Sequence, residues 1–179
     1  GGGGVAFDCA FTARRLGAAE VSLVCLEAEG AMRAPAEEIE QAREEDIVIR
    51  NSCLNTGVCC EGGCVTGVSA APIASFSFDS RGELHVEKLP GDPLLLAADL
   101  VICASGLTAD LGFLGARELE RTPRGLIAAD PTTMQTSLPG LFAAGDIVNG
   151  GKTVVEAVAQ GKAAAESIMD YLRKKEGVK

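Results

Sequence analysis

The sequence has little positive charge with which to bind a polyanion. Its 179 residues include 16 lysine and arginine residues against 25 aspartate and glutamate residues, which gives a formal net charge of −9. Nucleic acids and anionic membrane surfaces both bind clustered positive charge. We therefore expect neither nucleic acid nor a membrane as a partner. The only histidine, His85, stands alone in a polar segment, and we interpret it as a surface residue.

Long apolar runs are also absent. No stretch of 18 or more apolar residues occurs, so we expect no transmembrane helix. The sequence does not open on a positively charged stretch followed by an apolar one, so we expect no secretory signal. Apolar residues still make up 47% of the chain and charged residues 23%, which is typical of a globular protein with a sizeable core. These features predict a cytoplasmic protein.

The seven cysteines lack the paired C-x2-C spacing of structural zinc sites and of thioredoxin-like redox motifs. Four of them, Cys53, Cys59, Cys60 and Cys64, crowd one segment with C-x5-C-C-x3-C spacing. An odd number cannot pair completely, and we interpret all seven as reduced thiols of a reducing cytosol. A bound iron–sulfur cluster or a redox-active pair in this segment stays open as an alternative. The sequence predicts no metal site.

Apolar periodicity predicts helices alternating with strands. Such alternation indicates an α/β fold built on a parallel sheet, with an antiparallel hairpin inserted near the Gly-rich turn at residues 61–63. The expected helices cover residues 5–16, 36–45 and 153–174. The expected strands cover residues 21–26, 47–53, 56–60, 64–68, 100–104 and 141–144. The continuous apolar run at 100–104 is typical of a strand covered on both faces.

The first residues match a nucleotide-binding loop, Gly1-x-Gly3-x-x-Ala6, at the start of a helix. Glycine at the first position permits a tight strand-to-helix turn, and Gly3 lets the backbone approach a pyrophosphate. The small Ala6 lets helix and strand pack closely, while Gly4 and Val5 in the first turn supply free N–H groups. The loop thus predicts a pyridine-nucleotide site. A flexible glycine linker is the alternative explanation.

Glu27 closes the second predicted strand about 25 residues after the loop, where a carboxylate usually holds the adenosine ribose. A carboxylate accepts hydrogen bonds from free ribose hydroxyls and repels a 2′-phosphate. This favours NAD(H) over NADP(H). Arg33 is a basic residue nearby. It either favours binding of NADP(H) or is an exposed surface charge.

Several motifs together resemble the glutamate synthase small-subunit family, and within it the flavin portion of dihydropyrimidine dehydrogenase. The matching segments are residues 1–10, 15–18, 21–24, 32–34, 37–40, 42–45, 133–137 and 140–146. Where NADP-binding members of that family carry a basic residue after the second strand, this sequence has Leu26 and Glu27.

The resemblance implies a fold of two parts. Residues 1–104 would form a Rossmann-like three-layer domain that binds NAD(P)H, and residues 105–179 would form the C-terminal segment of an FAD-binding domain. The chain would cross between them at Ala104, Ser105 and Gly106. Gly145 and Asp146 would bind FAD. The helix that begins near Thr153 and Val154 would direct its N-terminus at the flavin, because a helix N-terminus stabilises negative charge on a reduced flavin.

The resemblance also implies an activity, an FAD-dependent NAD(P)H oxidoreductase. Hydride would pass from the nicotinamide to the flavin, and electrons would continue to an iron–sulfur domain or subunit. No side chain is needed as an acid–base catalyst. The N-terminal half of the FAD domain is expected outside this sequence, and a homo-oligomer stays open. The alternatives are a non-catalytic nucleotide-binding or scaffold module and an NAD-dependent dehydrogenase without flavin.

Overall fold

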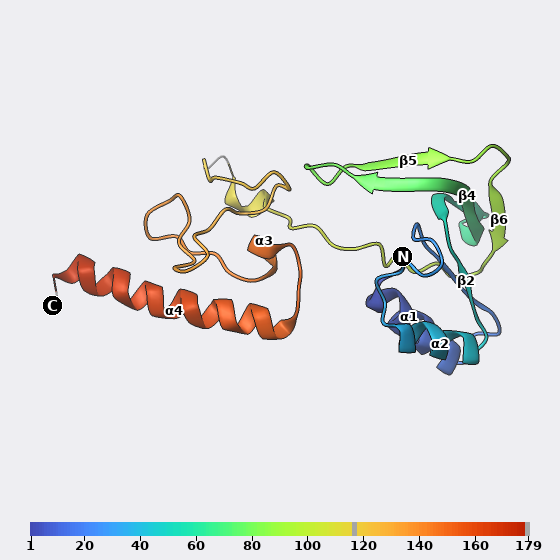
Figure 1. Ribbon diagram of the computed structural model, residues 1–179, viewed down its shortest axis with the longest axis horizontal. Helices are drawn as coiled ribbons and strands as arrows, with labels where there is room; N and C mark the ends of the chain where they lie inside the picture. The colour runs from blue at the N-terminus through green and yellow to red at the C-terminus, as the bar shows by residue number, and fades with distance from the viewer. Residues whose placement is uncertain (116–117, 178–179) are drawn as a thin grey trace. The chain divides into compact units, whose positions relative to one another are not determined.

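The computed structural model describes residues 1–115 and 118–177 (Figure 1). The chain divides into two compact units. The first unit comprises residues 1–79 and 84–106, and the second comprises residues 80–83 and the chain from Leu107 onward. The sequence placed a domain boundary just before this point, after Ala104. The assignment of the two parts to nucleotide-binding and flavin-binding domains stays a prediction.

The first unit begins with two helices that alternate with two parallel strands. They are α1 (Gly4–Arg15), β1 (Val21–Val24), α2 (Ala36–Glu44) and β2 (Ile47–Arg50). Strands β1 and β2 pair in parallel with Val21 opposite Ile47. Gly17 adopts a φ of 101° just after α1, a conformation that glycine reaches without strain and that ends the helix. The parallel α/β architecture predicted from the apolar periodicity is confirmed.

Aromatic and aliphatic side chains of α1 join this helix to the strands. Phe7 is completely buried and its ring lies 6.2 Å from that of Phe11, one helical turn later. The same core contains Leu23 of β1 and Ile47 of β2. Because the core includes Ala6 and Phe7 near the start of α1, it holds the N-terminus of this helix in a defined place beside the end of β1.

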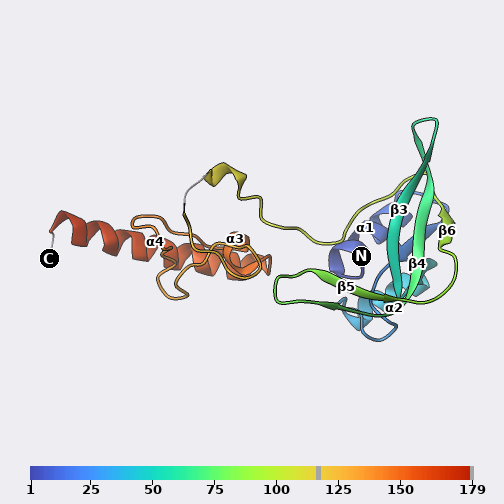
Figure 2. The ribbon, with the colours of Figure 1, turned by 90° about the horizontal axis from the view of Figure 1, so that it is seen from above.

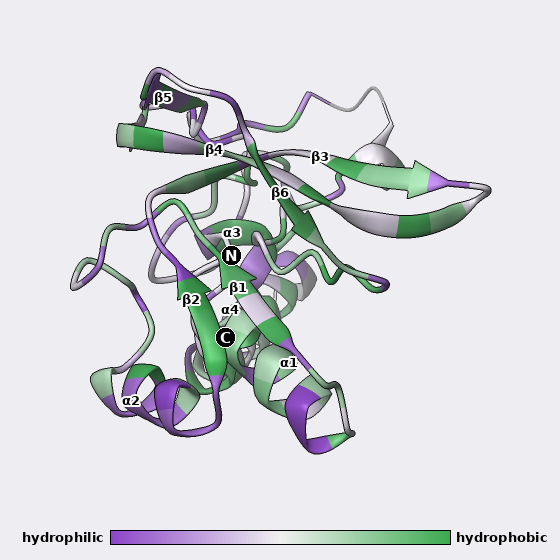
Figure 3. Ribbon diagram, turned by 90° about the vertical axis from the view of Figure 1, so that its right-hand side faces the viewer, coloured by the Kyte–Doolittle hydropathy of each residue, from purple (hydrophilic) through white to green (hydrophobic). Residues whose placement is uncertain are grey.

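An antiparallel sheet completes the first unit. Its strands are β3 (Cys53–Glu61), β4 (Cys64–Phe78), β5 (Leu84–Lys88) and β6 (Leu94–Ala97). Strand β4 pairs with each of the other three. The β3–β4 hairpin extends beyond the rest of its unit (Figure 2). Helices α1 and α2 lie on one side of the β1–β2 pair and the antiparallel strands lie on the other (Figure 3).

Two predicted strands are wrong. Residues 100–104 carry no strand assignment, and Leu100 and Ile102 are exposed rather than covered on both faces. A strand requires a hydrogen-bonded neighbour, and no described segment pairs with these residues. Residues 141–144 contain only an isolated bridge, between Phe142 and Gln135. In both places apolar content predicted a strand without identifying a pairing partner, and of the two segments only 141–144 contributes a buried core residue, Ala143.

The second unit consists mainly of loops, held by a small apolar core, and one long helix. The short helices are η1 (Gly112–Leu114) and α3 (Asp146–Asn149), and the long one is α4 (Val154–Glu176). Leu114, Ile127 and Ala143 belong to the core. Among the described residues, no helix combines the length and the apolar content needed to cross a bilayer.

Candidate functional site

The glycine loop is held between two segments of the first unit. The Gly1 nitrogen donates a hydrogen bond to the carbonyl oxygen of Val24 at 2.9 Å. On its other side, a methyl group at Gly1 would clash with the carbonyl oxygen of Ala104. Gly1 is thus required for packing, because only a residue without a side chain fits against the Ala104 backbone.

Gly3 lies in a different environment. It is the N-cap of α1, with φ −95° and ψ 170°, and a methyl group there would meet nothing within 4 Å. The helix has no side-chain cap, and its first turn, which includes Gly4 and Val5, contains no acidic residue. The N–H groups of Ala6 and Phe7 both turn back to the Gly3 carbonyl, at 2.9 and 3.4 Å. An uncapped helix N-terminus with open space before it fits the pyrophosphate of a dinucleotide.

Glu27 approaches the loop directly. A methyl group at Gly2 would lie 2.7 Å from the Oε2 of Glu27 and 3.0 Å from the Cβ of Cys25. Asn51 fixes the chain at this point, since its Nδ2 donates to the Glu27 carbonyl oxygen at 3.1 Å. The structure therefore brings the Glu27 carboxylate and the glycine loop together, as a ribose-binding carboxylate requires.

Cys25, beneath the loop, is an unreactive thiol. Burial, with a smaller effect from the charge of Glu27, raises the pKa of Cys25 to about 11. The thiolate form is therefore rare near neutral pH. In the described part of the chain all seven cysteines are free, and no group of three or more His, Cys, Asp or Glu side chains could hold a metal ion.

The remaining candidate residues of the first unit are Arg33 and the segment from Ala104 to Gly106. Arg33 is exposed, and it forms no ion pair with a described residue. Ser105 is also exposed, and Gly106 has a φ of 102°. The Ala104 carbonyl lies against Gly1, and Ala104 is also partly buried against the core of the first unit.

The second unit gathers its candidate residues around one hollow of about 340 Å³. Asp146, the first residue of α3, lines this hollow, as do Thr153 and Val154 at the start of α4. The other lining residues are Lys152, Ala157 and Val158. Gly145, just before Asp146, has a φ of 77° and donates its N–H to the Oε1 of Gln160 at 2.7 Å. A carboxylate, a lysine and a helix N-terminus around one open hollow fit the polar part of a flavin.

The N-terminus of α4 is closed by a capping box. The Thr153 hydroxyl accepts a hydrogen bond from the Glu156 N–H at 3.2 Å, and the Glu156 carboxylate accepts from the Thr153 N–H at 3.2 Å. The Thr153 hydroxyl also lies 2.9 Å from the same carboxylate. The sequence predicted an N-terminus directed at a ligand. The box occupies part of that N-terminus, and it does not involve the N–H groups of Val154 and Val155.

The capping box makes the stability of α4 depend on pH. Hydrogen bonds from the Thr153 backbone and side chain lower the pKa of Glu156. A carboxyl with a depressed pKa stabilises the fold above its unfolded pKa of about 4.3, and this contribution disappears as the pH falls through the folded value. We expect Glu156→Gln to raise amide exchange in the first turns of α4 at pH 7, and this effect to decrease as the pH falls through the lowered pKa of Glu156. Glu166→Gln, an exposed change on the same helix, serves as the control. An equal effect at pH 7 and at lower pH would contradict the charged box.

Most of the chain matches the profile of one known protein family. The family profile described as pyridine nucleotide-disulphide oxidoreductase matches residues 1–161. The chain belongs to this family. Membership implies FAD and a pyridine nucleotide as cofactors, and the predicted family and fold class are confirmed.

Relatives of this chain include several enzyme subunits. The chain is 43% identical over 173 residues to the NADP(+)-dependent formate dehydrogenase subunit beta of Moorella thermoacetica, covering 97% of the chain and 24% of that protein. It is 34% identical to the glutamate synthase [NADPH] small chain of Escherichia coli strain K12, covering 96% of the chain and 38% of that protein. It is 38% identical to the NAD-dependent dihydropyrimidine dehydrogenase subunit PreT of the same strain, covering 96% and 36%. The chain thus spans well under half the length of these relatives.

A solved structure has the same fold as this chain. The T. acidophilum thioredoxin reductase superposes with a TM-score of 0.71 at 22% identity, covering 97% of this chain and 51% of that one. This likeness supports the mixed α/β, Rossmann-like fold alone. The names of the relatives include NADP-dependent and NAD-dependent proteins, so they do not decide the preference for NAD(H).

The sequence pattern did not single out two side chains that the structure places at the candidate sites. Gln160 accepts a hydrogen bond from the Gly145 N–H, and Lys152 lines the hollow in the second unit. Gln160 follows Thr153 by seven residues, which places both on one face of a helix. That spacing was a usable signal, whereas nothing in the sequence pattern set Lys152 apart.

Proposed function

We propose that the protein carrying this chain is an FAD-dependent NAD(P)H oxidoreductase of the glutamate synthase small-subunit type. Bound nicotinamide and flavin supply the hydride transfer between them. The proposal rests chiefly on one observation: within a family that uses both cofactors, the glycine loop lies open at the N-terminus of α1 with the Glu27 carboxylate against it.

In this proposal the residues of the chain bind and orient, and none acts as an acid or base. The first unit holds the pyridine nucleotide, with the pyrophosphate at Gly3 and Gly4 and the adenosine ribose at Glu27. The second unit is the C-terminal segment of an FAD-binding domain, with Asp146 and the start of α4 at the flavin. We further propose a cytoplasmic protein whose electrons continue to an iron–sulfur domain or subunit.

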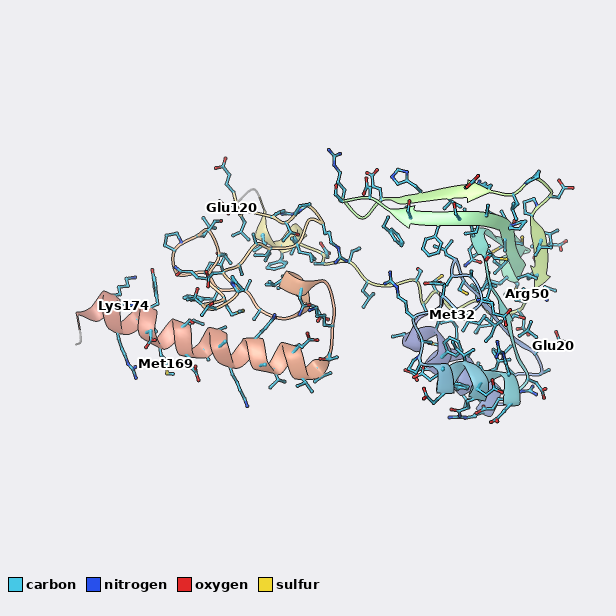
Figure 4. The ribbon with its side chains drawn as sticks, viewed as in Figure 1. Glu20, Met32, Arg50, Glu120, Met169 and Lys174 are labelled. Carbon is cyan, nitrogen blue, oxygen red and sulfur yellow. The ribbon has the colours of Figure 1, made fainter. Side chains whose placement is uncertain are left out.

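The apolar surface of α4 supports the view that another part of a larger protein covers it. Met169, labelled in Figure 4, projects from α4 and is 50% exposed. Five other apolar side chains of this helix are exposed: Val154, Val155, Val158, Ile168 and Leu172. Side chains of this kind are usually buried. We propose that the remainder of the FAD domain lies on them.

The test is an anaerobic titration of the full-length protein with NADH and, separately, with NADPH. We expect a visible flavin spectrum that bleaches on addition of the preferred nucleotide, which we propose to be NADH. A flavin that bleaches only with NADPH would contradict the nucleotide preference alone. A protein without flavin, or one that neither nucleotide reduces, would contradict the oxidoreductase proposal.

A further inference from the structure

A second carboxylate lies at the glycine loop, on α2. The Glu38 side chain is half-buried, and its Oε2 is completely buried without a hydrogen-bond partner among the described residues. This oxygen lies on the side of the first turn of α1, where a methyl group at Gly4 would be 3.7 Å from it. A buried acceptor without a donor is costly, and native structures rarely leave one unexplained.

Glu27 and Glu38 reach the loop from different elements. Glu27 follows β1 and lies against Gly2, whereas Glu38 lies in the first turn of α2 and approaches Gly4. Neither carboxylate forms an ion pair with a described residue. The two negative charges are therefore not neutralised by a basic side chain. The positive end of the α1 dipole favours both charges, and the positive end of α2 also favours Glu38.

The topology places both carboxylates where the adenosine end of a dinucleotide binds. Strands β1 and β2 are parallel, and α2 begins beyond the carboxyl end of β1. Dinucleotides bind outside the carboxyl ends of such strands, with the adenosine ribose at the acid that closes the second strand of the motif. Here that acid is Glu27, so Glu38, one element further along the chain, lies on the same edge.

We propose that Glu38 is a specificity-determining residue that, together with Glu27, selects a dinucleotide with free adenosine ribose hydroxyls. A 2′-phosphate brings negative charge toward two unneutralised carboxylates, whereas free ribose hydroxyls carry no charge and so meet no such repulsion. This inference rests on the proposed function, since it requires the dinucleotide to bind at this loop. The proposal adds Glu38 of α2 to Glu27, the residue after β1, as a residue that selects the nucleotide.

The experiment compares nucleotide affinities rather than turnover. Isothermal titration of the full-length protein with NAD⁺ and with NADP⁺ gives the ratio of their dissociation constants, Kd(NADP⁺)/Kd(NAD⁺). We expect Glu38→Gln to lower this ratio about tenfold, because one repulsive charge is removed next to the 2′-phosphate. Glu27→Gln should change the ratio in the same direction.

The matched control is Glu37→Gln. Glu37 is the neighbouring residue of α2, carries the same charge and is exposed, so its replacement should change the ratio less than twofold. A ratio that shifts equally in Glu38→Gln and Glu37→Gln, or that does not shift in either, would overturn the role of Glu38 alone. Equal weakening of both nucleotides by Glu38→Gln would also overturn it, since that indicates a structural role. If the unaltered protein binds neither nucleotide, the proposed function fails as well.

Discussion

Replacing Gly3 by alanine is expected to lower the affinity for pyridine nucleotide about a hundredfold while leaving the protein folded. The backbone of Gly3, at φ −95° and ψ 170°, is one that alanine adopts without strain, and a methyl group there meets no protein atom within 4 Å. The same methyl group would occupy the space through which the pyrophosphate approaches the α1 N-terminus. Isothermal titration with NAD⁺ measures the loss, and thermal unfolding checks the fold.

Gly1→Ala is the control that separates binding from packing. Its methyl group would clash with the Ala104 backbone, so we expect this variant to lose stability as well as nucleotide affinity. A Gly3→Ala protein that binds nucleotide normally would mean that the dinucleotide does not lie across this loop, and the proposed site would then be wrong.

Replacing Phe7 by alanine is expected to destabilise the first unit by about 3 to 5 kcal/mol. Phe7 is completely buried in the core that joins α1 to β1 and β2, so its removal leaves a cavity lined by these elements. Because folded domains are stable by only about 5 to 15 kcal/mol, much of the unit's stability would be lost. Hydrogen exchange of the α1 peptides measures this locally, without requiring the whole protein to unfold in one step.

Leu16→Ala tests whether burial, rather than helix composition, causes the effect. Leu16 caps the same helix but is 83% exposed, so its truncation should leave exchange in α1 nearly unchanged. If Phe7→Ala and Leu16→Ala change exchange equally, then the packing of α1 on the strands does not determine the stability of this unit.

The elements predicted well were those whose signal is local. Helix α1 follows from apolar residues at helical spacing, among them Ala6, Cys9 and Ala10, and ends where Gly17 stops it. Strands β1 and β2 are short apolar runs that alternate with helices, and this order alone favours parallel pairing. Helix α4 begins at Val154, directly after its N-cap Thr153, whose capping partner Glu156 stands three residues later, in the spacing of a capping box.

The segments predicted wrongly depend on partners distant in the sequence. Residues 100–104 have the composition of a buried strand, but whether they become one depends on a neighbouring strand that their own composition does not reveal. Residues 141–144 form a single bridge for the same reason.

The sequence by itself determined the family, the alternating α/β pattern, the loop at Gly1–Ala6 and the carboxylate that follows β1, because each depends on residues close together in the chain. Only the tertiary structure decided which glycines pack and which face open space, and only it brought Glu38 of α2 beside Gly4 of α1. That approach depends on how α1 and α2 pack on the parallel strands, and this is set by the shapes of buried side chains far apart in the sequence.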